Sequence, residues 1–130
     1  MTEEEGGVTY DTGALLAAEA GDREMWALHR RILEREVRPV IPAPVLAQAW
    51  RGGPQPLLSR FVKGCDVEDF SEQHARAVGS LLARAGTSDI VDAAVVLTAA
   101  TKDHSVVTSD PSDVSALADA HDTKINLHVV

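Results

Sequence analysis

The sequence predicts an α/β fold, a three-layer sandwich in which helices cover both faces of a mostly parallel central sheet. Short apolar runs alternate along the chain with longer segments whose apolar residues follow helical spacing. Aromatic residues supply only 4% of the chain against 45% hydrophobic residues, so Ala, Val, Leu and Ile must build the core. At 130 residues we expect a single domain over 1–130, with residues 1–7 as a flexible start.

The first half of the chain alternates strand and helix signals. Val8-Thr9-Tyr10 is a short apolar run that stops at Asp11-Thr12-Gly13 and gives way to a strong helix former, which predicts a strand, a sharp turn and a helix. Gly21-Asp22 breaks that helix, and a basic second helix with apolar residues at helical spacing ends near Val37. The other elements expected here are an extended segment at 39–42, a helix at 44–50 that Pro44 begins, and a helix at 56–62.

The second half continues the alternation. Cys65 to Phe70 is expected to form a third strand near an edge of the sheet. Ser71 and Glu72 open a helix that Gly86 closes. A nearly all-apolar helix from Asp89 to about residue 100 must be buried; a strand at 105–108, a helix at 111–118 and a strand at 125–130 complete the chain.

Acidic residues follow these predicted strands at the points where a parallel sheet carries its sites. Asp11 follows the first strand, and Ser109-Asp110 follows the strand at 105–108, so both carboxylates belong to the same sheet edge. Asp89 and Asp92 stand three residues apart at the start of the buried helix and face one side of it. We therefore expect acids from three segments to line one cleft.

Each acid also has a purely structural interpretation. Asp89, Asp110 and Asp113 are ordinary residues for the start of a helix, and singly this interpretation is preferred for them. Asp92 is different, because its apolar neighbours indicate burial and a buried carboxylate needs a strong partner. A divalent cation offsets the repulsion within such a cluster, and oxygen ligands favour Mg²⁺ or Mn²⁺, which promote phosphodiester hydrolysis.

Four segments of the chain form an ordered set of motifs: Val8-Thr9-Tyr10-Asp11-Thr12, Pro42-Ala43-Pro44-Val45-Leu46-Ala47, Asp89-Ile90-Val91-Asp92-Ala93-Ala94-Val95-Val96 and Thr108-Ser109-Asp110-Pro111-Ser112-Asp113. In this order they resemble the motifs of the PIN-domain family, and most closely those of VapC-type toxin ribonucleases. The resemblance implies catalytic and metal-binding roles for Asp11, Asp92 and Asp110. It implies further metal contacts from Asp89 and Asp113, and positioning roles for Thr12, Gln48, Thr108 and Ser109.

The same resemblance implies a Mg²⁺- or Mn²⁺-dependent endoribonuclease, the toxin of a type II toxin–antitoxin system. Its expected partners are an RNA substrate, a cognate antitoxin protein and a second copy of the chain. Gln48 departs from the family pattern, because a Glu is expected there and an amide lacks its charge. The alternative is therefore a catalytically weakened PIN-like module that binds RNA or protein.

The charge distribution leaves two interpretations open. Net charge is −8, yet ten of the twelve basic residues lie between Arg23 and Arg84 against seven acids there, so this stretch carries +3 and the remainder −11. The pattern indicates either solvated helix faces or acids gathered away from a basic, RNA-facing surface. The apolar runs are too short to cross a membrane and the acidic start is unlike a signal peptide, so we expect a cytoplasmic protein without membrane contact.

Two other α/β classes fit less well. A phosphorelay receiver domain would have adjacent acids after its first strand and a lysine after a late strand, where Asp11 stands alone and Ser109-Asp110 occurs. A haloacid-dehalogenase-like phosphatase would have a second Asp two residues after the first, at Gly13. The lone Cys65 offers neither a disulfide partner nor a thiolate cluster.

Overall fold

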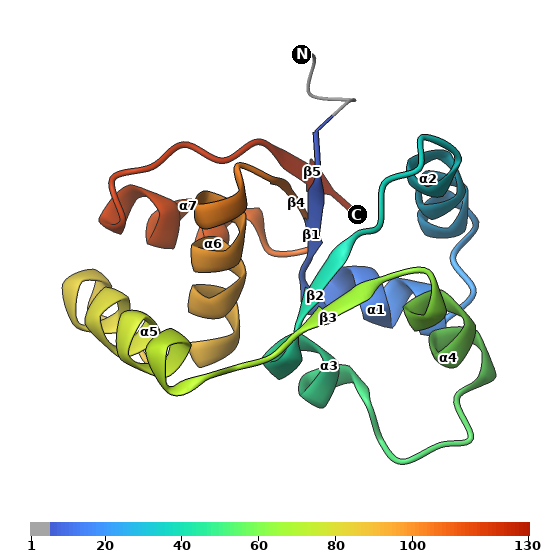
Figure 1. The fold of residues 1–130 in the computed structure, drawn as a ribbon, viewed down its shortest axis with the longest axis horizontal. Helices are drawn as coiled ribbons and strands as arrows, with labels where there is room; N and C mark the ends of the chain where they lie inside the picture. The colour runs from blue at the N-terminus through green and yellow to red at the C-terminus, as the bar shows by residue number, and fades with distance from the viewer. Residues whose placement is uncertain (1–5) are drawn as a thin grey trace.

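A computed structural model describes residues 6–130 and shows the expected three-layer α/β sandwich (Figure 1). The central sheet has five strands, all parallel, in the order β3-β2-β1-β4-β5. The strands are β1 (Val8–Tyr10), β2 (Val40–Pro42), β3 (Asp66–Glu68), β4 (Ser105–Thr108) and β5 (Leu127–Val129). The helices are α1 (Thr12–Glu19), α2 (Arg23–Glu34), α3 (Ala43–Ala49), α4 (Pro56–Lys63), α5 (Glu72–Ala85), α6 (Ile90–Lys102) and α7 (Pro111–Ala120).

The helices divide between the two faces of the sheet. Figure 1 shows α1, α2 and α4 on one side and α5, α6 and α7 on the other. The short helix α3 follows β2 directly and packs against both α1 and α6, one helix from each outer layer. Helices of both layers therefore meet near the carboxyl end of β2.

Local signals set most of the helix boundaries. Asp11 caps α1 through its side chain, and Ser71 caps α5 by accepting a hydrogen bond from the His74 N–H. Gly86 ends α5 in the left-handed conformation, with φ of 71°, which a glycine adopts without steric cost. The expected elements are all present, and the predicted position of β3 at an edge of the sheet is confirmed.

Some boundaries differ from the expected ones. The strand expected over 65–70 is reduced to Asp66–Glu68, and α2 ends at Glu34 before the expected Val37. The chain turns out of α2 at Glu36, whose positive φ of 61° is incompatible with a continuing right-handed helix. Helix α6 extends to Lys102, slightly further than expected. Local composition does not mark these ends, because packing and turn geometry decide them.

The core between the sheet and α2 and α4 contains a buried aromatic cluster of Tyr10, His29 and Phe61. The Tyr10 hydroxyl and His29 Nδ1 lie 2.8 Å apart, at hydrogen-bonding distance. The rings of His29 and Phe61 stack with centroids 4.1 Å apart. Burial lowers the pKa of His29 to about 4, so the imidazole is neutral at physiological pH. The cluster is a neutral, internally hydrogen-bonded part of the core.

The chain termini and surface bear on two further expectations. Of the start expected to be flexible, residues 1–5 lie outside the described residues, while the Gly7 carbonyl accepts a hydrogen bond from Ser105 N at 3.1 Å. None of the helices in residues 6–130 is both long and apolar enough to span a membrane.

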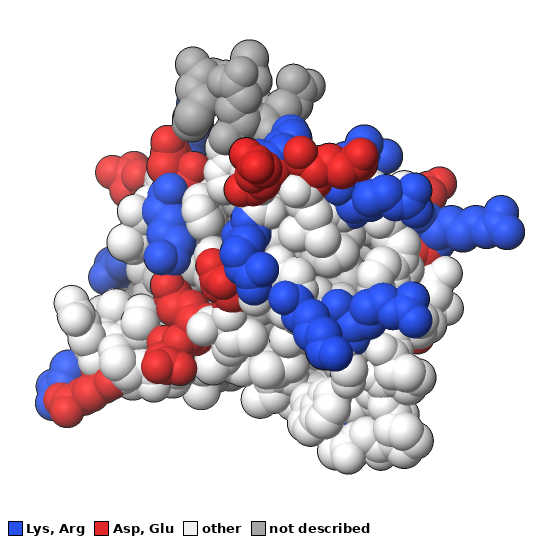
Figure 2. Space-filling view, turned by 45° about the vertical axis from the view of Figure 1, so that its right-hand side comes forward, with Lys and Arg blue, Asp and Glu red and all other residues white. Residues whose placement is uncertain are grey.

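Figure 2 brings the side of α2 and α4 forward and shows Lys and Arg spread over it, with acids between them.

Candidate metal centre

The candidate centre lies beyond the carboxyl ends of two neighbouring strands, β1 and β4. Asp11 immediately follows β1, and its backbone N–H donates to the Val107 carbonyl of β4 at 2.9 Å. Asp110 follows β4 and precedes α7, whose first turn carries Asp113. Asp92 lies in the first turn of α6. Because all five strands are parallel, the turns after β1 and β4 meet at one edge, as the sequence predicted.

Asp11 is buried, with 3% of its surface exposed, and its carboxylate is held from two sides. Oδ1 accepts the Thr12 backbone N–H at 2.7 Å, and Oδ2 accepts the Thr108 hydroxyl at 2.7 Å. The position at the N-terminus of α1 also favours a negative charge. Each carboxylate oxygen keeps a lone pair after these bonds, so Asp11 can still contact a cation.

Thr108 joins two of the acidic segments. Its hydroxyl donates to Asp11 and accepts the backbone N–H of Asp110 at 2.9 Å. The turn that contains Ser109 then packs on the first turn of α1, where a Cβ on Gly13 would come within 2.2 Å of the Ser109 hydroxyl. Gly13 is therefore needed for this close approach. Sequence reasoning missed this role, although a glycine inside a strong helix former is a usable signal.

The tightest group of carboxylates consists of Asp92, Asp110 and Asp113. One carboxylate oxygen from each lies within 4.8 Å of the others, with Asp92 buried and the other two exposed. Asp113 thus lies closer to Asp92 and Asp110 than the sequence indicated. Asp11 lies beside this group of three but is not a member of it. Among residues 6–130, no Lys or Arg forms an ion pair with any of these acids.

The uncompensated charge changes the acidity of the group. Burial raises the pKa of Asp92 to about 7, and the negative charges of Asp11, Asp89 and Asp110 act in the same direction. The pKa of Asp110 is also raised, chiefly by its hydrogen bond with Asp113. The raised pKa values mean that ionising these carboxyl groups costs free energy, and a bound cation would offset that cost. Hard carboxylate oxygens without competing Cys or His fit Mg²⁺ or Mn²⁺.

Asp89 and Gln48 are engaged in other contacts. Asp89 caps α6, because its Oδ1 accepts the Asp92 N–H at 3.0 Å, and it contributes negative charge to the group. Gln48 Oε1 accepts the hydroxyl of Thr12 at 2.6 Å. The Thr12 hydroxyl is therefore directed at Gln48, while the Thr12 backbone N–H holds Asp11. A neutral amide thus occupies the place near Asp11 where the family pattern expects a carboxylate.

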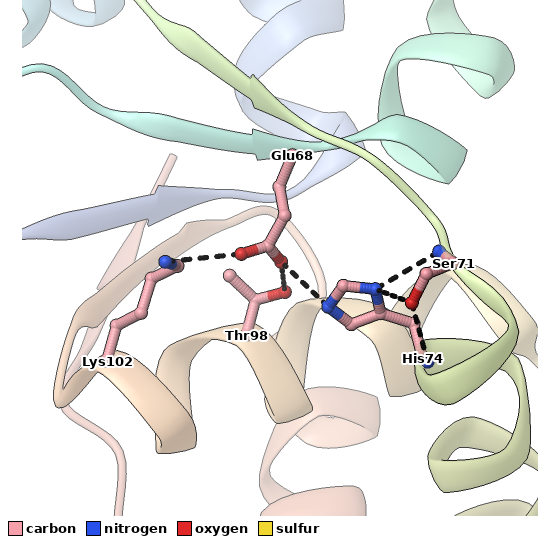
Figure 3. Close-up of polar contacts among 5 residues, drawn as sticks. All are labelled: Glu68, Ser71, His74, Thr98 and Lys102. Carbon is pink, nitrogen blue, oxygen red and sulfur yellow. Dashed lines mark hydrogen bonds and ion pairs between the residues drawn. The ribbon is translucent and has the colours of Figure 1, made fainter.

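A second polar cluster lies at the end of β3 (Figure 3). The Glu68 carboxylate accepts the Thr98 hydroxyl at 2.7 Å and pairs with Lys102 at 3.2 Å. Burial opposes ionisation of Glu68, but bonds from Thr98 and Lys102 outweigh it and lower its pKa. Glu68 also lies 3.8 Å from His74 Nε2, and His74 Nδ1 lies 2.9 Å from the Ser71 hydroxyl.

The Ser71, His74 and Glu68 arrangement has the composition of a hydrolase triad, but capping accounts for it. The Ser71 hydroxyl accepts the His74 backbone N–H at 3.2 Å, and His74 Nδ1 accepts the Ser71 backbone N–H at 3.1 Å. These reciprocal bonds form the capping box at the start of α5. We assign the cluster a structural role in joining β3, α5 and α6.

Comparison with solved structures defines the class of fold. No protein-family model matches the sequence, and a search of curated proteins finds no relative. VapBC2 from Rickettsia felis, solved bound to a DNA fragment from its promoter, is similar with a TM-score of 0.70 and 16% identity, over 95% of this chain and 98% of that one. PAE2754 from Pyrobaculum aerophilum gives a TM-score of 0.61 and 18% identity, over 95% and 83%.

The chain accordingly has a PIN-like α/β fold, as the motif resemblance predicted. Identities of 16% and 18% establish the fold and leave the chemistry to be argued from the side chains. The acidic group at the carboxyl edge of β1 and β4 is a set of side chains in this fold that could hold a metal ion.

Proposed function

We propose that this protein is a Mg²⁺- or Mn²⁺-dependent endoribonuclease and the toxin component of a type II toxin–antitoxin pair. One observation carries the nuclease proposal: carboxylate oxygens of Asp92, Asp110 and Asp113 lie within 4.8 Å of one another, with no basic partner among residues 6–130. Asp11 adds a fourth carboxylate whose position hydrogen bonds already define.

The proposed roles follow from these contacts. Asp92, Asp110 and Asp113 hold the cation, with Asp11 next to them and Asp89 adding negative charge. Thr108 keeps Asp11 and the turn at Asp110 in register, and Ser109 packs against Gly13 at the start of α1. When bound, the ion supplies positive charge that orients a water molecule for in-line attack and neutralises the phosphodiester. Burial of Asp11 and Asp92 limits competition by bulk water.

The decisive experiment is cleavage of a structured RNA with Mg²⁺, with Mn²⁺ and with chelator. We expect metal-dependent cleavage that Asp92→Asn and Asp113→Asn each reduce by at least about 100-fold, a loss of about 2.7 kcal/mol in transition-state stabilisation. Asp119→Asn is the matched control, since Asp119 is an exposed acid on the same helix as Asp113. Metal-independent cleavage, or full activity of Asp92→Asn with an intact fold, would overturn the mechanism.

The toxin assignment rests on the motif resemblance and on structural similarity to VapBC2. The partners that follow are RNA, a small antitoxin encoded beside this gene, and a second copy of the chain, all in the cytoplasm. We expect expression of the chain to arrest growth of a bacterial host, and co-expression of the neighbouring small reading frame to relieve the arrest. Growth arrest by the inactive Asp92→Asn variant would contradict toxicity through RNA cleavage.

Gln48 favours the second candidate, a PIN-like module that binds RNA or protein without cutting. Its amide already accepts the Thr12 hydroxyl and brings no negative charge to Asp11. If the wild-type protein is inert, Gln48→Glu is the informative variant, because restored cleavage identifies the missing charge as the cause. RNA binding by an inert Gln48→Glu protein would instead favour the binding module.

A further inference from the structure

A groove on the opposite side of the molecule from α6 and α7 lies between α2 and the β4–β5 edge of the sheet. It encloses about 700 Å³. Helix α2 and the residue that ends it, Arg35, supply one wall. Leu28, Arg31 and Ile32 follow helical spacing and share a face, and Glu34 and Arg35 complete the wall at the end of the helix. Val8, Ser105, Val107 and His128 supply the floor from β1, β4 and β5. The groove thus has an apolar interior, and its wall carries two arginines and one glutamate.

Strand β5 at the side of this groove is the last strand of the described sheet and has one open edge. Val106 N–H donates to the Asn126 carbonyl, and Val130 N–H donates to the Thr108 carbonyl, each at 2.9 Å. In a parallel ladder, alternate residues point their backbone groups to the same neighbour. The N–H and carbonyl groups of Leu127 and Val129 therefore point away from β4, towards the open edge.

An open edge of this kind usually carries a charge or a proline that blocks pairing. Here β5 reads Leu-His-Val, and Val129 is 57% exposed. Glu34 lines the groove beside Arg31 and Arg35, but neither arginine forms an ion pair within the described part of the chain. The edge is therefore able to accept another strand, and these three residues give the adjoining wall a net charge of 2 − 1 = +1.

We propose that β5 and this groove bind an extended, acidic segment of a partner protein, which adds to the sheet as a sixth strand. The outward-pointing N–H and carbonyl groups of Leu127 and Val129 would form main-chain hydrogen bonds with the segment. Alternate side chains of the segment, which are apolar, would enter the groove. Acidic residues of the segment would meet Arg31 and Arg35. The proposal is independent of RNA cleavage and of the acidic centre.

Charge favours this occupant over a second copy of the chain. Two copies paired through β5 about an axis perpendicular to the sheet would place both α2 helices on the same side of the joined sheet. Arg31 and Arg35 of both copies would then approach the junction, and like charges oppose such pairing. RNA phosphates could pair with the arginines, but RNA has no peptide N–H and carbonyl groups to form hydrogen bonds with the open strand edge.

The test uses two fluorescent ten-residue peptides, one alternating valine with glutamate and one alternating valine with lysine. We expect the glutamate peptide to bind the full chain at least tenfold more tightly in fluorescence anisotropy. Arg31→Glu combined with Arg35→Glu should reverse that preference. The matched control is Arg60→Glu combined with Lys63→Glu, a basic pair on α4 that does not line the groove, and it should leave binding unchanged.

Val129→Pro separates strand addition from simple charge attraction. It removes an N–H that points to the open edge and leaves the bonds to β4 in place, so the fold should survive. We expect at least a tenfold loss of glutamate-peptide binding with thermal unfolding within a few degrees of wild type. Unchanged binding by a folded Val129→Pro protein would overturn the proposal. So would equal competition by single-stranded polyuridylate, or a wild-type dimer that Val129→Pro dissociates.

Discussion

Tyr10 and Asp11 are neighbours in the chain, yet they belong to two polar clusters with opposite charge balance. The Tyr10 hydroxyl and His29 Nδ1 lie 2.8 Å apart, deep beneath α2 and α4, and both groups are neutral. Asp11 lies beyond the end of β1, beside Asp92, Asp110 and Asp113. The first cluster satisfies itself, whereas the second accumulates negative charge without a basic partner among residues 6–130.

This difference separates a contribution to stability from a contribution to function. A buried hydrogen-bonded pair whose two rings both stack on Phe61 stabilises the fold. A buried carboxylate among other carboxylates opposes folding, and the raised pKa of Asp92 expresses that cost. Groups that cost stability are often retained where they act on a ligand, so the acidic centre is the half of the comparison to which we assign the proposed function.

We expect the largest effect on stability from a variant that breaks the neutral cluster. His29→Ala removes the partner of the Tyr10 hydroxyl and the ring stacked on Phe61, so we expect a loss of about 3 kcal/mol in the free energy of unfolding. Urea denaturation at pH 7.5 measures it. His128→Ala, at an exposed histidine, should change the same quantity by less than about 0.5 kcal/mol. Equal effects of the two variants would contradict the distinction.

The next effect is a pH dependence of opposite sign in the two clusters. The folded pKa of His29 is lowered to about 4, so its contribution to stability is lost as pH falls from about 6.5 towards 4. The folded pKa of Asp92 is raised to about 7, so its contribution is present near pH 4 and lost as pH rises through about 7. In the wild-type protein the two trends oppose each other.

Single variants should reveal each trend in metal-free protein. Asp92→Asn leaves the histidine contribution, so its stability should fall on acidification from pH 6.5 to 4. His29→Gln keeps an acceptor for Tyr10 without a titratable ring, so its stability should rise over the same interval. We expect changes of about 2 kcal/mol in each, measured by urea denaturation across pH. Slopes of the same sign in both variants would refute the assignment.

A smaller effect tests the link between Asp11 and the remaining acids. Thr108→Val removes the hydroxyl that bonds Asp11 and the Asp110 N–H, and we expect Mn²⁺ affinity to fall about tenfold in calorimetric titration. Thr108→Ser keeps the hydroxyl and should stay within about twofold of wild type. Thr98→Val, which disturbs the Glu68 cluster instead, is the distant control. Equal losses from Thr98→Val and Thr108→Val would show a general effect on folding.

Much of the architecture was predictable because local signals agree with the final fold. Short-range chemistry accounts for the order of strands and helices, the edge position of β3, the helix starts at Ser71 and Asp89, and the end of a helix at Gly86. Parallel pairing then brings the residues after β1 and β4 to one edge. For this reason the acidic centre was predictable in outline, before the distances between its members were known.

The sequence could not predict which carboxylates of the acidic centre lie closest together, because this depends on rotamers and on contacts between distant segments. The motif resemblance implied Asp11, Asp92 and Asp110 as the catalytic acids, whereas tertiary packing groups Asp92 with Asp110 and Asp113. Gly13 fits against Ser109 only because two turns from opposite ends of the chain meet there. The sequence by itself thus determined the fold class and the supply of acids. Tertiary structure alone decided which carboxylates share a centre, since that is a matter of distances across the sheet edge.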